Sequence, residues 1–171
     1  MSKQLLAVIV FLALLIPTAA LAGPPIVREI QLQRQLAAVR AATARYHNID
    51  AAIADGYLPT DHCVDQPGSG MGYHYFNPAL GGDLVSDPQK PELLIYIPDG
   101  HGGRKLGAVE YFQADMGQQH PVLFGQRFDG PMDGHEPGMP VHYDLHVWLY
   151  ERNPDGVFAP WNPAVSCSGA H

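Results

Sequence analysis

Histidine and carboxylate side chains are concentrated in one short segment of this chain. The sequence contains nine histidines, and residues 135–146 alone hold five potential metal ligands: His135, Glu136, His142, Asp144 and His146. Imidazole and carboxylate groups are ligands for Zn²⁺, Cu²⁺, Fe²⁺ and Mn²⁺. The pattern therefore indicates a transition-metal site, and copper or zinc is favoured because both have high affinity for imidazole.

The segment that carries these ligands alternates between apolar and polar residues, as a β-strand does. Side chains alternate across a strand, so His142, Asp144 and His146 share one face of a strand over 141–150. At ~3.4 Å per residue, His142 and His146 are about 13–14 Å apart, too far to share one ion on a flat strand. We therefore expect one or two ligands from this strand and the others from elsewhere in the sheet.

Two polar residues inside otherwise apolar segments are the natural further ligands. His74 lies in the aromatic segment 71–76, and Glu110 lies in the apolar segment 106–112. His135 and Glu136 belong to a Gly- and Pro-rich loop over 125–140 that could close a site from outside. We expect an ion bound by three histidines and one carboxylate; the histidines are His74, His142 and His146, and the carboxylate is Asp144, Glu110 or Glu136.

Two other classes of function stay open at this point. In a metal-free ligand- or protein-binding domain, the histidines would make only structural hydrogen bonds, and aromatic side chains would hold the partner. A small metal-dependent enzyme would need an open coordination position beside a pocket. The sequence does not decide between enzyme and binding protein, and it identifies no catalytic residue.

Hydrophobic periodicity predicts the elements that position the candidate ligands. Segment 26–54 has apolar residues at spacings of three and four, which predicts a helix that ends before Gly56. Strand-like segments follow at 71–76, 93–97, 106–112 and 141–150. This order predicts an α+β domain in which one long N-terminal helix precedes a mainly antiparallel, loop-rich β-sheet.

The first 22 residues have the pattern of a secretory signal peptide. Lys3 precedes a twelve-residue apolar run over 5–16, and small residues at 20 and 22 allow cleavage before Gly23. The apolar run is shorter than the roughly 20 residues that a membrane-spanning helix needs. We therefore expect a secreted or periplasmic protein without a stable membrane span after cleavage, with residues 23–171 forming a single domain.

The two cysteines fit the same interpretation. Cys63 and Cys167 both follow the predicted signal peptide, and an even number of cysteines in an exported chain predicts a disulfide. This bond would join the C-terminus to the start of the β region.

Composition excludes one class of partner. The chain has 171 residues and a formal net charge of −7, from ten Lys and Arg against 17 Asp and Glu. A protein that neutralises phosphates with a basic surface is therefore not expected, so no nucleic-acid partner is predicted. A protein partner is neither indicated nor excluded.

Several segments resemble those of a set of exported bacterial proteins with no established activity. The resemblance extends over about residues 41–168 and implies an exported single-domain protein, but it implies no activity or cofactor. The segments are ARYH (44–47), ADGY (54–57), GMGYHY (70–75), VEY (109–111), HEPGMPVHYDLHVW (135–148) and APWNP (159–163), followed by Cys167.

Overall fold

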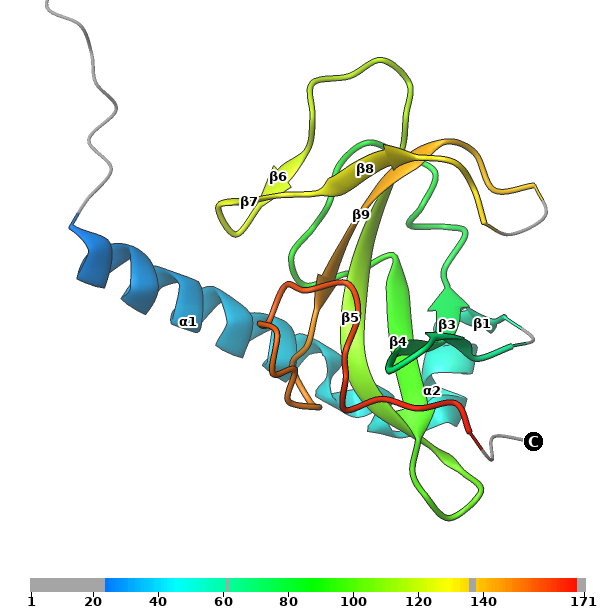
Figure 1. Cartoon of the computed structure of the whole chain (residues 1–171). Helices are drawn as coiled ribbons and strands as arrows, with labels where there is room; N and C mark the ends of the chain where they lie inside the picture. The colour runs from blue at the N-terminus through cyan, green and yellow to red at the C-terminus, as the bar shows by residue number, and fades with distance from the viewer. Residues whose placement is uncertain (1–23, 61, 136–137, 169–171) are drawn as a thin grey trace, which may run out of the picture.

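The computed structural model describes residues 24–60, 62–135 and 138–168. The predicted signal peptide and Glu136 lie outside these ranges. The described chain begins with helix α1 (Pro25–Thr43), a 3-10 turn η1 (Ala44–His47) and helix α2 (Ile49–Ala54). Strands follow, so the predicted order of one long helix and then a mainly antiparallel sheet is confirmed (Figure 1).

The helical region is interrupted near its end. Pro25 occupies the first turn of α1, where its missing N–H costs no helical hydrogen bond. The Asn48 side chain accepts a hydrogen bond from the Asp50 backbone N–H and so starts α2 as a separate helix. Gly56 has φ +95° just after α2, as expected for the residue that ends a helix.

Seven strands form the main sheet, with β1-β3-β4-β5-β9-β8 as the hydrogen-bonded order and β2 paired to β3. All of these pairs are antiparallel. A separate hairpin is formed by β6 and β7. The strands are β1 (Leu58–Pro59), β2 (Val64–Gln66), β3 (Ser69–Phe76), β4 (Leu93–Pro98), β5 (Arg104–Ala114), β6 (Val122–Leu123), β7 (Gln126–Arg127), β8 (Asp129–Met132) and β9 (His142–Val147).

Two boundaries differ from the sequence-based expectation. The loop expected over 125–140 contains the short strands β7 and β8, and β8 pairs with β9. The last strand ends at Val147 rather than at residue 150, because its regular pairing with β5 stops at Val109 and Val147. Trp148 donates to Val157, whereas Tyr150 and Glu151 both donate to Gly107.

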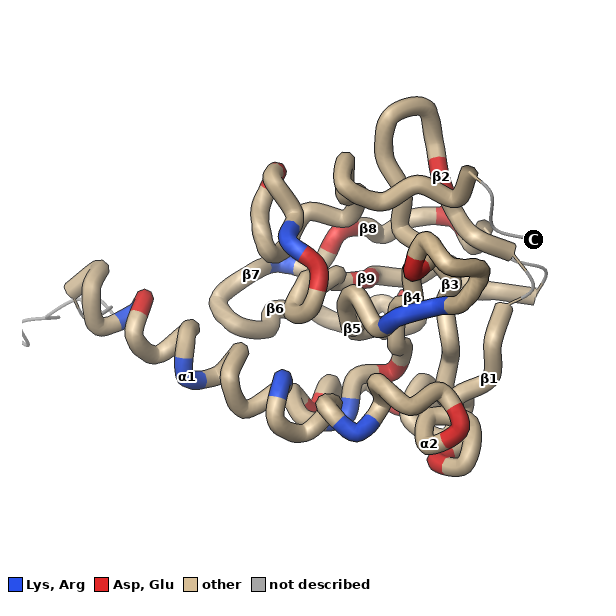
Figure 2. The backbone as a smooth tube through the Cα atoms, turned by 90° about the horizontal axis from the view of Figure 1, so that it is seen from below, with Lys and Arg blue, Asp and Glu red and all other residues tan. Residues whose placement is uncertain are grey.

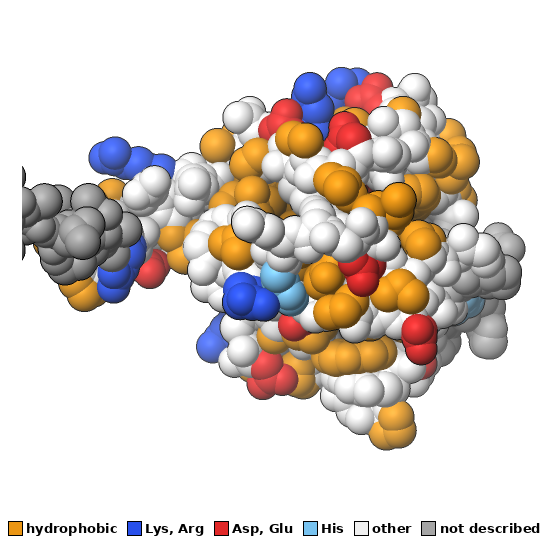
Figure 3. Space-filling view, turned by 90° about the horizontal axis from the view of Figure 1, so that it is seen from above, with side chains coloured by type: hydrophobic (Ala, Val, Ile, Leu, Met, Phe, Trp, Pro, Cys, Tyr) orange, Lys and Arg blue, Asp and Glu red, His pale blue; other side chains and the backbone are white. Residues whose placement is uncertain are grey.

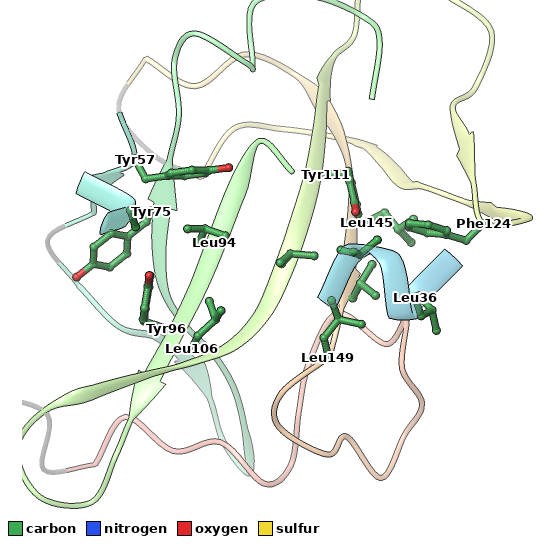
Figure 4. Packing of buried hydrophobic residues seen from close by; sticks show 14 of the residues in the cluster. Leu36, Tyr57, Tyr75, Leu94, Tyr96, Leu106, Tyr111, Phe124, Leu145 and Leu149 are labelled. Atoms are coloured by element: carbon green, nitrogen blue, oxygen red, sulfur yellow. The ribbon is translucent and has the colours of Figure 1, made fainter. Parts of the chain in front are cut away.

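One face of the sheet packs on the helices. The second half of α1 contributes Leu36 and Val39 to this core, whereas its first half is largely exposed and extends beyond the sheet (Figure 1). Aromatic side chains such as Tyr57 and Tyr111 lie toward the two sides of this layer, with aliphatic side chains such as Leu94 between them (Figure 4). Lys and Arg positions lie along α1 and also in the strand-bearing part of the molecule, including the start of β5 (Figure 2 and Figure 3).

The other face of the sheet carries the candidate ligands and is covered by loops. A smaller apolar cluster lies on it, formed by Ile95, Ile97, Ala108, Trp148 and Val165. The predicted disulfide between Cys63 and Cys167 is present, with 5.8 Å between the two Cα atoms, and it ties the C-terminal segment to the residue before β2. Within the described ranges, α1 and α2 are not long and apolar enough to cross a membrane.

Candidate metal centre

Strand register brings three of the predicted ligands to one place. Glu110 on β5 lies directly opposite His146 on β9. His74 lies on β3, two strands away from β5, and its side chain reaches across β4. The backbone positions of His74 and His146 are therefore three strand spacings apart, or roughly 14 Å. Their rings nevertheless approach to 6.0 Å between centroids, with Glu110 between them.

The three side chains form a compact set of donors, which we call the metal cluster. His74 Nε2 lies 3.4 Å from Glu110 Oε2, and His146 Nε2 lies 3.7 Å from the same oxygen. One ligand atom of each residue lies within 4.8 Å of the other two. These separations suit ligands around a shared ion, because metal–ligand bonds of about 2.0–2.2 Å place neighbouring donor atoms 3–4 Å apart.

The metal cluster is buried and its hydrogen bonds are incomplete. Glu110 is 2% exposed and His146 is 1% exposed. Among the described residues, Glu110 Oε2 and both ring nitrogens of His146 have no hydrogen-bond partner. A buried polar atom without a partner costs roughly 1–3 kcal/mol, and more when the group is charged. A bound cation would satisfy these atoms and remove that cost.

Burial also sets the protonation of the cluster. Desolvation, together with a smaller contribution from nearby histidines, lowers the pKa of His74 to about 4 and that of His146 to about 3. Both imidazoles are therefore neutral at pH 7, the form that binds metals. Desolvation raises the pKa of Glu110 well above its ordinary value, and the charges of Asp144 and Glu92 act in the same direction.

The remaining candidate ligands lie beside the cluster. The structure does not bring His142 into it: His142 Nε2 lies 3.8 Å from Asp144 Oδ2 instead. Desolvation raises the pKa of Asp144 to about 7, with a further contribution from Asp129. His135 lies over this pair, 5.1 Å from the His142 ring. Glu136 was also a predicted ligand, but it lies outside the described residues.

Two cavities flank these side chains. The first, of about 370 Å³, has His74 and Glu110 on its wall. Its other walls are mostly apolar and include Val64, Phe76, Leu93, Phe112, Met139 and Pro140. The second, of about 350 Å³, is lined by His62, Val64, Met71, Asp129, Met132, His135, Asp144, Pro160 and Trp161. The hollowed face of the sheet therefore has room beside the ligands for small molecules.

Glu92 is a further buried carboxyl that the sequence does not indicate. It is 2% exposed, and one of its oxygens accepts a hydrogen bond from the Phe112 backbone N–H on β5. Desolvation raises its pKa to about 7. Glu92 immediately precedes β4, so its position has no alternation pattern that could have indicated burial.

Gly72 fixes the backbone beside His74. Its φ is +106°, and a Cβ atom there would lie 2.5 Å from the Tyr96 carbonyl oxygen on β4. We expect Gly72→Ala to lower the free energy of unfolding by about 2–3 kcal/mol, because it adds backbone strain and a clash with a neighbouring strand. It should also weaken metal binding by moving His74. Urea denaturation and metal titration measure both effects.

Gly68→Ala is the matched control for this substitution. Gly68 has φ +86° in the turn between β2 and β3, and a Cβ atom there meets nothing within 4 Å. The Gly68→Ala substitution should lower the free energy of unfolding by about 1–2 kcal/mol through backbone strain alone, and it should leave metal affinity unchanged. Equal stability losses for the two variants would show that the clash with Tyr96 is unimportant.

Comparison with known proteins assigns no function to this arrangement. No family model, curated protein or solved structure matches the chain. The resemblance to exported bacterial proteins therefore stays a prediction.

Proposed function

We propose that this chain is an exported protein that binds a divalent transition-metal ion through His74, Glu110 and His146. The observation that carries the proposal is the set of three buried ligand atoms within 4.8 Å of one another. The unpartnered atoms of Glu110 and His146 support it, because a cation is the group that would satisfy them together.

The metal-free alternative gains less support from the same contacts. If the histidines had only structural roles, their ring nitrogens would have hydrogen-bond partners in the backbone or in carboxylates. His146 has none among the described residues, and its Nε2 is 3.7 Å from the nearest Glu110 oxygen, beyond hydrogen-bond distance.

The chemistry of the donors favours zinc. Two imidazoles and one carboxylate without a thiolate are typical of zinc sites that keep a fourth position for water or substrate. Copper also has high affinity for imidazole, and a similar donor set holds Fe²⁺ in some enzymes. We infer zinc as the resident ion, with copper as the first alternative.

A catalytic role is the second candidate function, and one observation favours it. The cavity of about 370 Å³ has His74 and Glu110 on its wall, so an ion at the cluster would border an apolar space. A fourth coordination position that opens to such a cavity is what a metal-dependent enzyme requires.

The disulfide supports the exported location. Cys63 and Cys167 are bonded, and structural disulfides persist in oxidising compartments such as the periplasm. The predicted signal peptide is the other support for this part of the proposal.

Elemental analysis of the protein exported to a bacterial periplasm, without a polyhistidine tag, tests the proposal directly. We expect close to one equivalent of Zn or Cu for the highest-affinity site. At a free metal concentration of 100 Kd, the metal should raise the melting temperature of the stripped protein by roughly 5–10 °C.

Variants separate the cluster from adventitious histidine binding. His146→Ala should lose the bound ion and the thermal shift. His101→Ala removes an exposed imidazole from the turn between β4 and β5 and should change neither. Wild-type protein that holds no metal and shows no thermal shift with Zn²⁺ or Cu²⁺ would refute the proposal.

A further inference from the structure

A second pair of metal-binding side chains lies beside the metal cluster, on the same face of the sheet. His142, Asp144 and His146 occupy alternate positions of β9, and His142 is the farthest of the three from the cluster. His142 Nε2 and Asp144 Oδ2 are 3.8 Å apart, and the two side chains are 0% and 4% exposed. The pair is as deeply buried as the cluster and lies outside it.

The hydrogen bond of His142 determines which nitrogen has a free lone pair. Its Nδ1 lies 3.1 Å from the Pro140 carbonyl oxygen, which can only accept, so Nδ1 carries the proton and donates. In the neutral imidazole, Nε2 is then an acceptor. A backbone carbonyl that holds the distal N–H in this way is the usual support for a histidine that binds a metal.

Two acceptors therefore face each other in a buried space. Among the described residues, neither His142 Nε2 nor Asp144 Oδ1 has a hydrogen-bond partner. A lone pair opposite a carboxylate at 3.8 Å is unfavourable in a medium of low dielectric constant unless a positive charge lies between them. That charge is either a proton or a metal ion.

Access to this pair differs from access to the metal cluster. Asp144 lines the cavity of about 350 Å³, whereas His74 and Glu110 line the cavity of about 370 Å³. His135 lines both cavities, and its ring is 5.1 Å from that of His142. An ion could therefore reach Asp144 without passing the cluster, and His135 is placed to bind it from the loop.

We propose that His142 and Asp144, completed by His135, bind a second divalent transition-metal ion. The proposal rests on the proposed function, since the two sites share one face of the sheet. One ion does not serve both, because His142 is not among the ligand atoms that lie within 4.8 Å of one another, and its Nε2 lies against Asp144 instead. Among the described residues only the metal cluster has three ligand atoms mutually within 4.8 Å, so the second ion binds more weakly.

Titration of the metal-stripped full-length exported protein with Co²⁺, followed by visible absorption and calorimetry, tests this inference. The wild type should bind two equivalents, the second at least tenfold more weakly. His142→Phe removes the donor while a ring still stacks on Phe112, as the imidazole does at 5.1 Å. It should keep only the tight equivalent, and Asp144→Asn should do the same.

The complementary variants identify each site. His146→Ala should lose the tight equivalent and keep the weak one. His101→Ala, the exposed-histidine control, should keep both. Near-ultraviolet circular dichroism of each variant reports whether the aromatic core is intact, so loss of binding is distinguished from loss of folding.

The other outcomes decide against the second ion in distinguishable ways. One equivalent that His146→Ala abolishes and His142→Phe leaves unchanged would mean that only a proton bridges His142 and Asp144. One equivalent that both variants abolish would mean a single shared ion. Both results overturn the second site and leave the proposed function standing, whereas no Co²⁺ binding by the wild type overturns both.

Discussion

Glu110→Gln is expected to abolish tight metal binding while leaving the metal-free protein at least as stable as the wild type at pH 8. Glu110 is the buried centre of the metal cluster, and its Oε2 lies within 4 Å of both His74 Nε2 and His146 Nε2. Removal of its charge should weaken Zn²⁺ binding by more than about 100-fold, since loss of a supporting partner outside the coordination shell already costs 10–100-fold. Competition with a chromophoric chelator measures this change.

Glu110 should also affect how the free energy of unfolding of the metal-free protein depends on pH, and the direction of this effect follows from its raised pKa. Because the pKa of Glu110 is raised on folding, its protonation stabilises the fold below about pH 4.5, and this contribution is lost as pH rises through the folded pKa. His74 and His146 change the stability with pH in the opposite direction, because folding lowers their pKa values to about 4 and 3. Their contribution is present above pH 6.5 and is lost as pH falls toward those values.

Glu92→Gln is the matched control for both measurements. Glu92 is equally buried and its pKa is raised to about 7, so its substitution should flatten the stability profile between about pH 4.5 and 7. It lies outside the metal cluster and should leave Zn²⁺ affinity unchanged. If Glu110→Gln and Glu92→Gln had equal effects on affinity, Glu110 would not be a ligand.

Loss of the disulfide is expected to have the largest effect on stability. Cys63 and Cys167 are 104 residues apart in sequence. Closing a loop of that length should stabilise the fold by about 4–5 kcal/mol, chiefly by restricting the unfolded chain. The double variant Cys63→Ser, Cys167→Ser should therefore melt roughly 10–20 °C lower in differential scanning calorimetry.

A reducing agent provides the control for this prediction. It should lower the melting temperature of the wild type to that of the double variant and have no effect on the double variant itself. A shift of less than about 3 °C in both cases would show that the bond contributes little to the fold.

The strand pattern of the sequence was enough to predict which face carries the ligands. Alternation over 141–150 placed His142, Asp144 and His146 together, and all three side chains are buried on the face opposite the helical core. The structure also brings His74 and Glu110, which the sequence predicts as further ligands from other strands, together with His146. These inferences succeeded because the two-residue period of a strand is a local property of the chain.

The grouping of ligands could not be predicted in the same way. The sequence predicts that His142 shares an ion with His74 and His146. The structure instead groups His74 and His146 with Glu110 and places His142 against Asp144. Which ligands meet depends on strand order, register and sheet twist, and these arise from contacts between distant segments. The burial of Glu92 could not be predicted either, because this residue immediately precedes β4 and has no alternation pattern of its own.

Each strand that supplies a cluster ligand is hydrogen-bonded on both sides, since β3, β5 and β9 all have neighbours at either edge. Such strands cannot move to adjust the ligand positions to an ion without breaking backbone hydrogen bonds to the neighbouring strands. The spacing of the donors is therefore set before any ion arrives, and little ordering entropy remains to be lost on coordination. Discrimination among metals would then follow bond length and preferred geometry, rather than the general affinity order that favours copper.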